Sequence, residues 1–234
     1  QFNCNRVTDE NVRKALLFAM DKKAMDDAAY ESDEYYSIPY TFLPTNSQFY
    51  TEEGVEKYDQ DVDKAKSMLK DAGVSNLKLK LGYISSDPVQ SAQALLIQEQ
   101  LKAIDVNVDI QGIDANGFFD VVFTDKDDYE LYLNEYAAIG DPGEVVAGMF
   151  DGTWGNNIDT PQEILDLFEQ GRKTTDVEKR TEIYKELQEK AMESYLTYPI
   201  AYPNYCFATS DNLEGAETYS TTPVFEDYTK LSFK

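Results

Sequence analysis

Apolar residues recur with a helical period in several stretches of the chain. Between residues 11 and 29 they follow the i, i+3, i+4, i+7, i+8 spacing that places them on one face of a helix, with Asp9 or Thr8 as its cap. Residues 61–72 and 88–104 show the same period, and Gly73 stands where a left-handed C-terminal cap is expected. These patterns predict three amphipathic helices in the first half of the chain.

Two more helices are predicted from their start signals in the second half. Thr-Pro-Gln-Glu at residues 160–163 has the form of a capping box, with Pro161 at the first helical position. Thr-Asp-Val-Glu at residues 175–178 repeats the box and opens a helix that continues through Ala191.

Alternating apolar and polar residues predict the strands. Leu77, Leu79 and Leu81 alternate with lysines, and residues 106–110 alternate in the same way. Because the predicted helix at 88–104 separates these two strands, they are expected to form a parallel, right-handed βαβ unit. The chain is therefore predicted to be of the α/β class.

Three further segments complete the predicted organisation. Residues 129–136 form another strand, and residues 198–208 are extended and apolar. Pro199 and Pro203 restrict that second segment to a sheet edge or to a crossing between domains. Residues 30–58 read as a long, tyrosine-rich loop, and loops of that length usually bind a ligand or wrap a surface.

Charge and composition exclude several classes of function. The 234 residues contain 44 Asp and Glu against 21 Lys and Arg, a formal net charge of −23, and no histidine. Such a chain lacks the clustered cations that nucleic acid requires, so no nucleic-acid partner is expected. Without histidine it cannot by itself form a Ser-His-Asp triad or a His-ligated metal site. Its 42% hydrophobic content is ample for a packed core.

The two cysteines and the chain start leave alternatives open. Cys4 and Cys206 are far apart in sequence, so they either form a disulfide closing a long loop or are both plain buried thiols. The chain begins without an initiator Met or a signal sequence, which indicates a piece of a longer protein.

Two patterns of acidic residues could indicate a calcium site or a glycoside-hydrolase site. The acidic run at residues 125–128 lacks the later Glu of a calcium-binding loop and is read as a solvated turn. Paired carboxylates together with Trp154 could serve glycoside hydrolysis, but Glu130 and Glu135 fall on opposite faces of one predicted strand. No phosphate-binding glycine loop occurs in the sequence.

The order of the segments resembles that of the family 5 solute-binding proteins, the extracytoplasmic receptors of ABC importers for oligopeptides, dipeptides and nickel. Each stretch alone is weakly specific, but together and in order they cover most of the chain. They are VRKALLFAMDK (12–22), YDQDVDKAKSMLKDAG (58–73), IQEQLKAIDVNV (97–108), GDP (140–142), DVEKRTEIYKELQEKAME (176–193) and YPI (198–200).

This resemblance implies lobe II of a two-lobed, type II periplasmic-binding-protein-like fold, an α/β lobe with a mixed sheet flanked by helices. Residues 1–200 would form the ligand-binding lobe II, and residues 201–234 would return toward an N-terminal lobe I that lies outside this chain. The resemblance brings Cys4 and Cys206 nearer together and so favours their disulfide. The implied partners are a peptide or other small solute, the missing lobe and the transmembrane subunits of an ABC permease.

The resemblance also suggests a ligand site. In peptide-binding members an Asp shortly before the GDP turn pairs with the α-amine of the ligand, but this chain has Ala138 or Ile139 there, which argues against simple recognition of a peptide zwitterion. The predicted cleft residues are Glu135, Tyr136, Ala137, Ala138, Asp141, Trp154 and Asn156.

The predicted function is the substrate-binding component of an ABC importer. It would act outside the cytoplasm, in the periplasm or as a cell-surface lipoprotein, and would need no catalytic residue, metal or cofactor. The competing prediction is an acidic secreted carbohydrate-binding or glycoside-hydrolase domain.

Overall fold

A computed structural model describes residues 1–123, 128–136, 141–144, 146–153, 157–204, 206, 208–218 and 227–234. Its helices are α1 (Glu10–Phe18), α2 (Lys22–Ala29), α3 (Val62–Asp71), α4 (Pro88–Lys102), α5 (Ala115–Phe123), α6 (Gln162–Lys173) and α7 (Val177–Glu193). Its strands are β1 (Tyr36–Ser37), β2 (Lys78–Ile84), β3 (Asn107–Ile113), β4 (Leu131–Tyr132), β5 (Tyr202–Pro203), β6 (Leu213–Glu214) and β7 (Ser232–Phe233).

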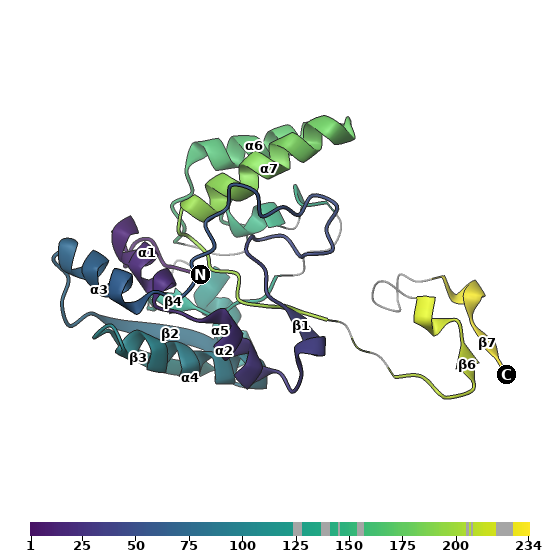
Figure 1. Cartoon of the computed structure of the whole chain (residues 1–234), viewed down its shortest axis with the longest axis horizontal. Coiled ribbons are helices and arrows are strands. Elements are labelled where there is room, and N and C mark those ends of the chain that lie inside the picture. The colour runs from purple at the N-terminus through teal and green to yellow at the C-terminus, as the bar shows by residue number, and fades with distance from the viewer. Residues whose placement is uncertain are drawn as a thin grey trace.

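The main sheet has the order β3-β2-β4, with both neighbours parallel to β2. Leu81 pairs with Ile110 on one side and with Leu131 on the other. Helix α4 connects β2 to β3 and packs against both, which confirms the predicted βαβ unit. Phe2 adds an antiparallel bridge to Leu131, so the sheet is mixed, as expected. The fold is an α/β sheet with helices packed on it (Figure 1).

The predicted helix over residues 11–29 is two helices. Asp21 takes an extended backbone conformation, and its carboxylate accepts a hydrogen bond from the Ala24 amide (3.1 Å) as the N-cap of α2. Apolar residues return at Ala24 and Met25, so the pattern can be read as one helix, but the capping Asp21 ends one helix and begins another. Asp9 caps α1 through the Asn11 amide (2.8 Å), as predicted.

Other boundaries also differ from the sequence pattern. The pattern predicts no element at α5, whose Phe118 is fully buried. The strand expected over residues 129–136 is only two residues long, because only Leu131 and Tyr132 pair with β2. Helix α3 and the left-handed Gly73 (φ 70°) that follows it match the prediction.

The two predicted capping boxes are wrong in detail. Pro161 remains extended (φ −53°, ψ 136°), so α6 starts after it, and the Thr160 hydroxyl is buried without a hydrogen-bond partner among the described residues. In α7 the cap is Asp176, whose carboxylate accepts from the Lys179 amide (3.1 Å), rather than Thr175. An extended residue cannot be the first helical residue, so the cap position moves one residue along in both helices.

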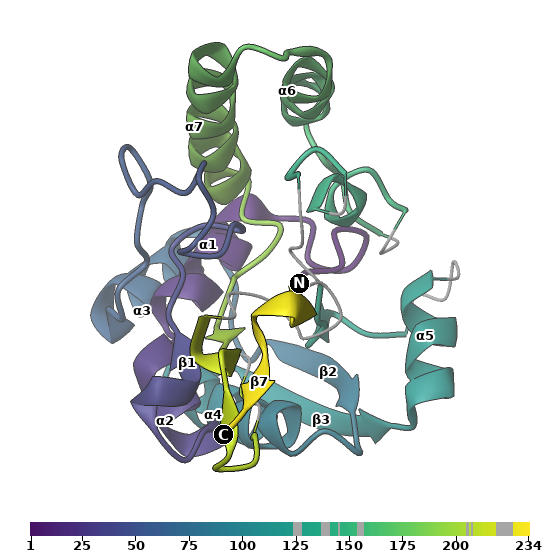
Figure 2. The same cartoon turned by 90° about the vertical axis from the view of Figure 1, so that its right-hand side faces the viewer.

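Two clusters of buried side chains organise the molecule. We call the first the sheet core, formed where α1, α2, α3 and α4 pack around β2 and β3; it includes Leu16, Leu81 and Leu101. We call the second the hairpin core, formed where α6 and α7 pack against each other and against loop residues such as Phe42; it includes Phe168 and Tyr184. Figure 2 shows α6 and α7 above the sheet, with α5 on the opposite side from α1 and α3.

The C-terminal part of the chain first runs along the α/β domain and then extends away from it. After α7, β5 pairs antiparallel with β1, so the extended segment forms the edge pairing expected from its prolines. The last residues form a small antiparallel pair, β6 with β7, that stands apart from the rest (Figure 1).

Both cysteines are free thiols. The disulfide favoured by the resemblance is not formed. The alternative of two buried thiols holds for Cys4, which is buried, and is wrong for Cys206, which is exposed. No helix among the residues that the structure describes is long and apolar enough to cross a membrane.

Candidate functional site

A cavity of about 390 Å³ opens at one edge of the main sheet. Three parts of the chain enclose it: the first turns of α4, residues 132–136 at the end of β4 and directly after it, and the crossing segment 197–203. Gln1, Tyr30, Phe42 and Met149 complete its walls. Its volume falls in the usual range of small-molecule pockets, and the carboxyl edge of parallel strands is where α/β proteins commonly bind ligands.

The sheet determines which residues reach this edge. Because β2 and β4 run parallel, their carboxyl ends lie side by side, and the Leu133 amide still donates to the Gly82 carbonyl (2.9 Å). Asn134, Glu135 and Tyr136 follow directly and line the cavity. On the other side, Asp87 caps α4 by accepting from the amides of Val89 (2.8 Å) and Gln90 (3.1 Å).

Two of the predicted cleft residues, Glu135 and Tyr136, are brought together in this cavity. The Tyr136 hydroxyl donates to Gln1 Oε1 (2.8 Å) and accepts from Asn134 Nδ2 (2.9 Å). Four other predicted residues, Ala137, Ala138, Trp154 and Asn156, lie outside the described residues.

Asp141, the seventh predicted residue, does not line the cavity. Its carboxylate accepts from the Gly143 amide (2.9 Å) and the Tyr184 hydroxyl (2.9 Å) and pairs with Arg180. Partial burial acts to raise the pKa of Asp141, but these donors outweigh it and hold that pKa below its ordinary value. In this structure Asp141 therefore ties the turn at residues 141–144 to α7.

Negative charge collects around Glu135. This residue is exposed as a whole, yet partial desolvation of its carboxyl, and then the neighbouring carboxylate of Asp87, raise its pKa. Burial raises the pKa of Tyr30 to about 12, with Asp26, Glu135 and Asp87 acting in the same direction. The wall between α2, α4 and β4 is therefore electronegative.

Sequence reasoning missed the residues that α4 contributes. Gln90 is only 3% exposed; its Oε1 accepts from the Ile84 amide (2.9 Å), and its Nε2 has no hydrogen-bond partner among the described residues. Gln93 Nε2 donates to Asp26 Oδ1 (3.1 Å). Both glutamines continue the apolar stripe of Ala94 and Leu101, and polar residues at core positions were the signal that could have identified them.

A second, smaller cavity of about 100 Å³ lies behind the crossing segment. Lys22 reaches into it, donates to the Pro39 carbonyl (2.8 Å), and lies 4.3 Å from the centre of the Tyr198 ring. Burial lowers the pKa of Lys22 to about 7. Tyr198 lines both cavities, so the crossing segment forms a shared wall.

Glu130 is held in a structural role and does not line the cavity. It is 8% exposed, one oxygen pairs with Arg6 (2.5 Å), and the other accepts from the Lys80 amide (2.6 Å). Within the described ranges no group of three or more acidic or cysteine side chains could hold a metal ion.

Comparison with known proteins gives a consistent result. A family model described as bacterial extracellular solute-binding proteins, family 5 Middle, matches residues 1–157. The chain is similar to the structure of ABC transporter substrate binding protein CtaP from Listeria monocytogenes (32% identity, TM-score 0.89), covering 99% of this chain and 49% of that one. It is equally similar in sequence to a protein named AppA from Clostridium difficile (32% identity, TM-score 0.85, covering 100% and 50%).

A sequence relative has a named function. The chain is 22% identical over 229 residues to the oligopeptide-binding protein AppA of Bacillus subtilis (strain 168), covering 88% of this chain and 41% of that protein. This chain thus spans about half the length of the relatives it matches.

Proposed function

The chain belongs to the family 5 bacterial extracellular solute-binding proteins, and we propose that it captures a peptide or similar small solute for an ABC importer. In this proposal residues 1–200 form one lobe, residues 201–234 return toward a second lobe outside this chain, and the solute is held between the two. Closure of the lobes over the solute would then present the loaded protein to the permease subunits.

The observation that carries the proposal is the position of the 390 Å³ cavity. It lies where the carboxyl ends of β2 and β4 meet the crossing segment 197–203, so the residues that shape it are also those that lead out of this lobe. A solute bound there would contact the strand ends on one side and be covered by a second lobe on the other. Glu135 and Tyr136 are the proposed contacts from the strand end.

We propose that the protein acts outside the cytoplasm and binds its solute without chemical change. The carbohydrate-active alternative gains no support, because the Glu130 carboxylate is engaged by Arg6 and the Lys80 amide and cannot act with Glu135. We also propose that the protein is a cell-surface lipoprotein and that Ala137, Ala138, Trp154 and Asn156 contact the solute.

The test uses the full-length protein that contains this chain. Native mass spectrometry of the freshly purified protein would identify a co-purified solute, and thermal unfolding would be followed with tetrapeptides and with aryl glycosides. We expect an intact peptide or small solute to bind and to raise the melting temperature. Hydrolysis of a glycoside, or a protein that carries no co-purified solute and is stabilised by none of the peptides, would contradict the proposal.

A further inference from the structure

Lys22, the first residue of α2, is buried in an unfavourable setting. It is 7% exposed, and no ion pair between described residues involves it. Asp26 and Asp59 favour its charged form, yet burial outweighs them and lowers the pKa of Lys22 to about 7. A cation in the first turn also opposes the helix dipole. A residue that costs the fold free energy in these ways is expected where it serves function rather than stability.

The contacts of Lys22 join α2 to two other segments. Its Nζ donates to the Pro39 carbonyl (2.8 Å), in the loop over residues 30–58, and lies 4.3 Å from the centre of the Tyr198 ring in the crossing segment. The centre of the Tyr40 ring, in the same loop, is 5.3 Å from this nitrogen. Attraction between an ammonium group and an aromatic face is strongest where water is excluded. Lys22 therefore holds the crossing segment and the loop to α2 through its charge.

Tyr198 carries this contact to the solute cavity. It lines both the 390 Å³ cavity and the smaller cavity into which Lys22 reaches, and its hydroxyl donates to the Met20 carbonyl (3.4 Å). Residues 199–203 follow it directly and line the 390 Å³ cavity as well. The far end of the segment is held by the pairing of β5 with β1. The position of the Tyr198 ring therefore determines where this wall of the solute cavity begins.

We propose that Lys22 is a positioning residue for solute binding. By holding the Tyr198 ring, it keeps the crossing segment in the place where that segment forms a wall of the solute cavity, before the solute arrives. A wall that is already ordered removes part of the entropic cost of binding, so Lys22 raises affinity although it does not line the solute cavity itself. This inference rests on the proposed function and adds to it a residue outside the site.

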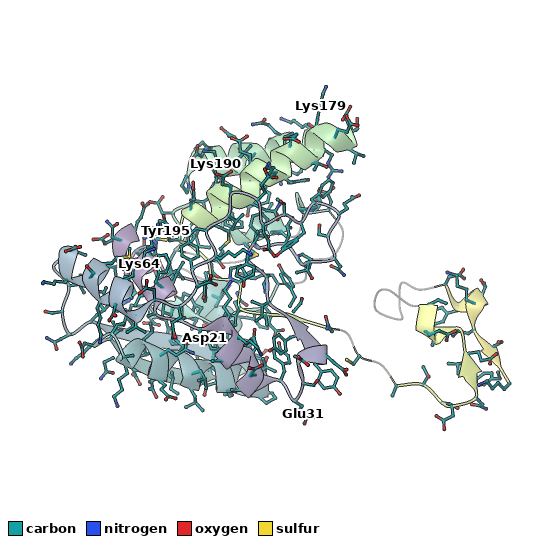
Figure 3. The ribbon with its side chains drawn as sticks, in the orientation of Figure 1. Asp21, Glu31, Lys64, Lys179, Lys190 and Tyr195 are labelled. Atoms are coloured by element: carbon teal, nitrogen blue, oxygen red, sulfur yellow. The ribbon has the colours of Figure 1, made fainter. Side chains whose placement is uncertain are left out.

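The test compares three variants of the full-length protein with the wild type. Lys22→Met removes the charge and keeps the length of the side chain, whereas Lys22→Arg keeps the charge, and the adjoining cavity of about 100 Å³ leaves room for the larger group. Lys64→Met is the matched control. Lys64 of α3, labelled in Figure 3, also lies over an aromatic ring (3.4 Å from Nζ to the centre of the Phe18 ring), but it lines neither cavity.

The first measurement is amide hydrogen exchange of the solute-free proteins at about pH 6, where the Lys22 ammonium is charged. We expect exchange in residues 197–203 to be about fivefold faster or more in Lys22→Met, because the crossing segment loses its attachment to α2. Exchange there should match the wild type in Lys22→Arg and in Lys64→Met. Unchanged exchange of these residues in Lys22→Met would overturn the proposal, whether or not a solute binds.

The second measurement separates affinity from stability. Isothermal titration calorimetry with tetra-alanine gives the affinity, and urea unfolding gives the free energy of unfolding. We expect Lys22→Met to weaken binding about fivefold while its free energy of unfolding equals or exceeds that of the wild type, because the buried charge is gone. Lys22→Arg should restore the affinity. Unchanged affinity in Lys22→Met, parallel losses of affinity and stability, or no rescue by Lys22→Arg would overturn the positioning role.

The positioning role can fail separately from the proposed function. If tetra-alanine does not bind the wild type, capture of this peptide is contradicted, and the exchange comparison alone decides the role of Lys22. Faster exchange confined to residues 197–203 in Lys22→Met would then support the attachment of the crossing segment. Exchange that is equal in all the variants would reject it.

Discussion

The sheet core and the hairpin core are built from different kinds of contact. In the sheet core, α4 packs against β2 and β3, the two strands that it connects, so this part of the core is built from elements that follow one another in the chain. In the hairpin core, α6 and α7 bury Phe168 and Tyr184 against Phe42 and Phe49, which are more than 100 residues away in sequence.

This difference shows what the loop over residues 30–58 does. Phe42 and Phe49 are buried, and Gln188 of α7 donates to the Phe49 carbonyl (2.8 Å) while it accepts from the Thr41 hydroxyl (2.9 Å). The loop therefore packs against α6 and α7 and completes the hairpin core. Because Phe42 also lines the ligand cavity, the same loop links that core to the site.

The largest expected effect is a cavity in the sheet core. Leu101→Ala removes a side chain that is 0% exposed, and we expect it to lower the free energy of unfolding by about 3 kcal/mol. Leu95→Ala on the same helix is the control, because Leu95 is 54% exposed and its loss should change stability by about 0.5 kcal/mol or less. Urea unfolding of the full-length protein, followed by circular dichroism, measures both. Equal losses in the two variants would show that α4 is not packed as described.

A smaller effect depends on pH and on Asp26 in α2. Burial raises the pKa of this carboxyl from 3.8 to about 7, although Gln93 and Lys22 act against the rise. Between these two values the folded state binds a proton that the unfolded state has lost, so this group makes stability fall as pH rises from about 4 to 7. Asp26→Asn removes this pH-dependent loss of stability. We expect the free energy of unfolding of the variant to exceed that of the wild type by on the order of 2 kcal/mol at pH 7 and to equal it near pH 4.

The control for this prediction is Asp27→Asn on the same helix. Asp27 is exposed, and hydrogen bonds from Lys23 and Tyr36 lower its pKa, so its removal should bring no gain at pH 7. Stability would be measured by urea unfolding at several pH values. An Asp26→Asn variant whose pH profile runs parallel to that of the wild type would contradict the buried, raised carboxyl.

The smallest effect tests the hairpin core through one hydroxyl group. Tyr184→Phe keeps the ring against Phe49 (centroids 4.8 Å apart) but removes the hydrogen bond to Asp141. We expect the free energy of unfolding to fall by about 1 kcal/mol. Amide exchange should become faster only in α6, α7 and the turn at residues 141–144. Tyr35→Phe, at an exposed tyrosine, is the matched control. A loss that spreads equally into the sheet core would show that the two cores are not separate units.

The fold could be predicted from the sequence where contacts are local. The βαβ unit around α4 follows from alternation and helical period alone, and its parallel pairing is confirmed. The helix break at Asp21 is not predicted this way, because apolar residues return at Ala24 and Met25 and allow one continuous helix to be read across the cap. Thr160 begins the expected capping sequence, but it lies one residue before the actual N-cap of α6, because Pro161 has an extended backbone.

The candidate site was predictable only in part. Glu135 and Tyr136 were placed by the resemblance and line the cavity together. Gln90, Tyr30 and Tyr198 come from three distant segments and meet only through tertiary packing, so no local pattern could join them. Lys190 of α7, labelled in Figure 3, pairs with Glu163 of α6 (3.0 Å), an ion pair that lies outside the cavity and serves the surface rather than a site.

Amide hydrogen exchange of the full-length protein, with and without bound solute, tests the central claim most directly. If the cavity is the solute site, exchange should slow in three segments, residues 87–93, 133–136 and 197–203, while the outer face of α7 stays unchanged. Slower exchange in all three segments would support a solute that contacts both the strand ends and the crossing segment. A bound solute that leaves these three segments unchanged would contradict the assignment of the cavity.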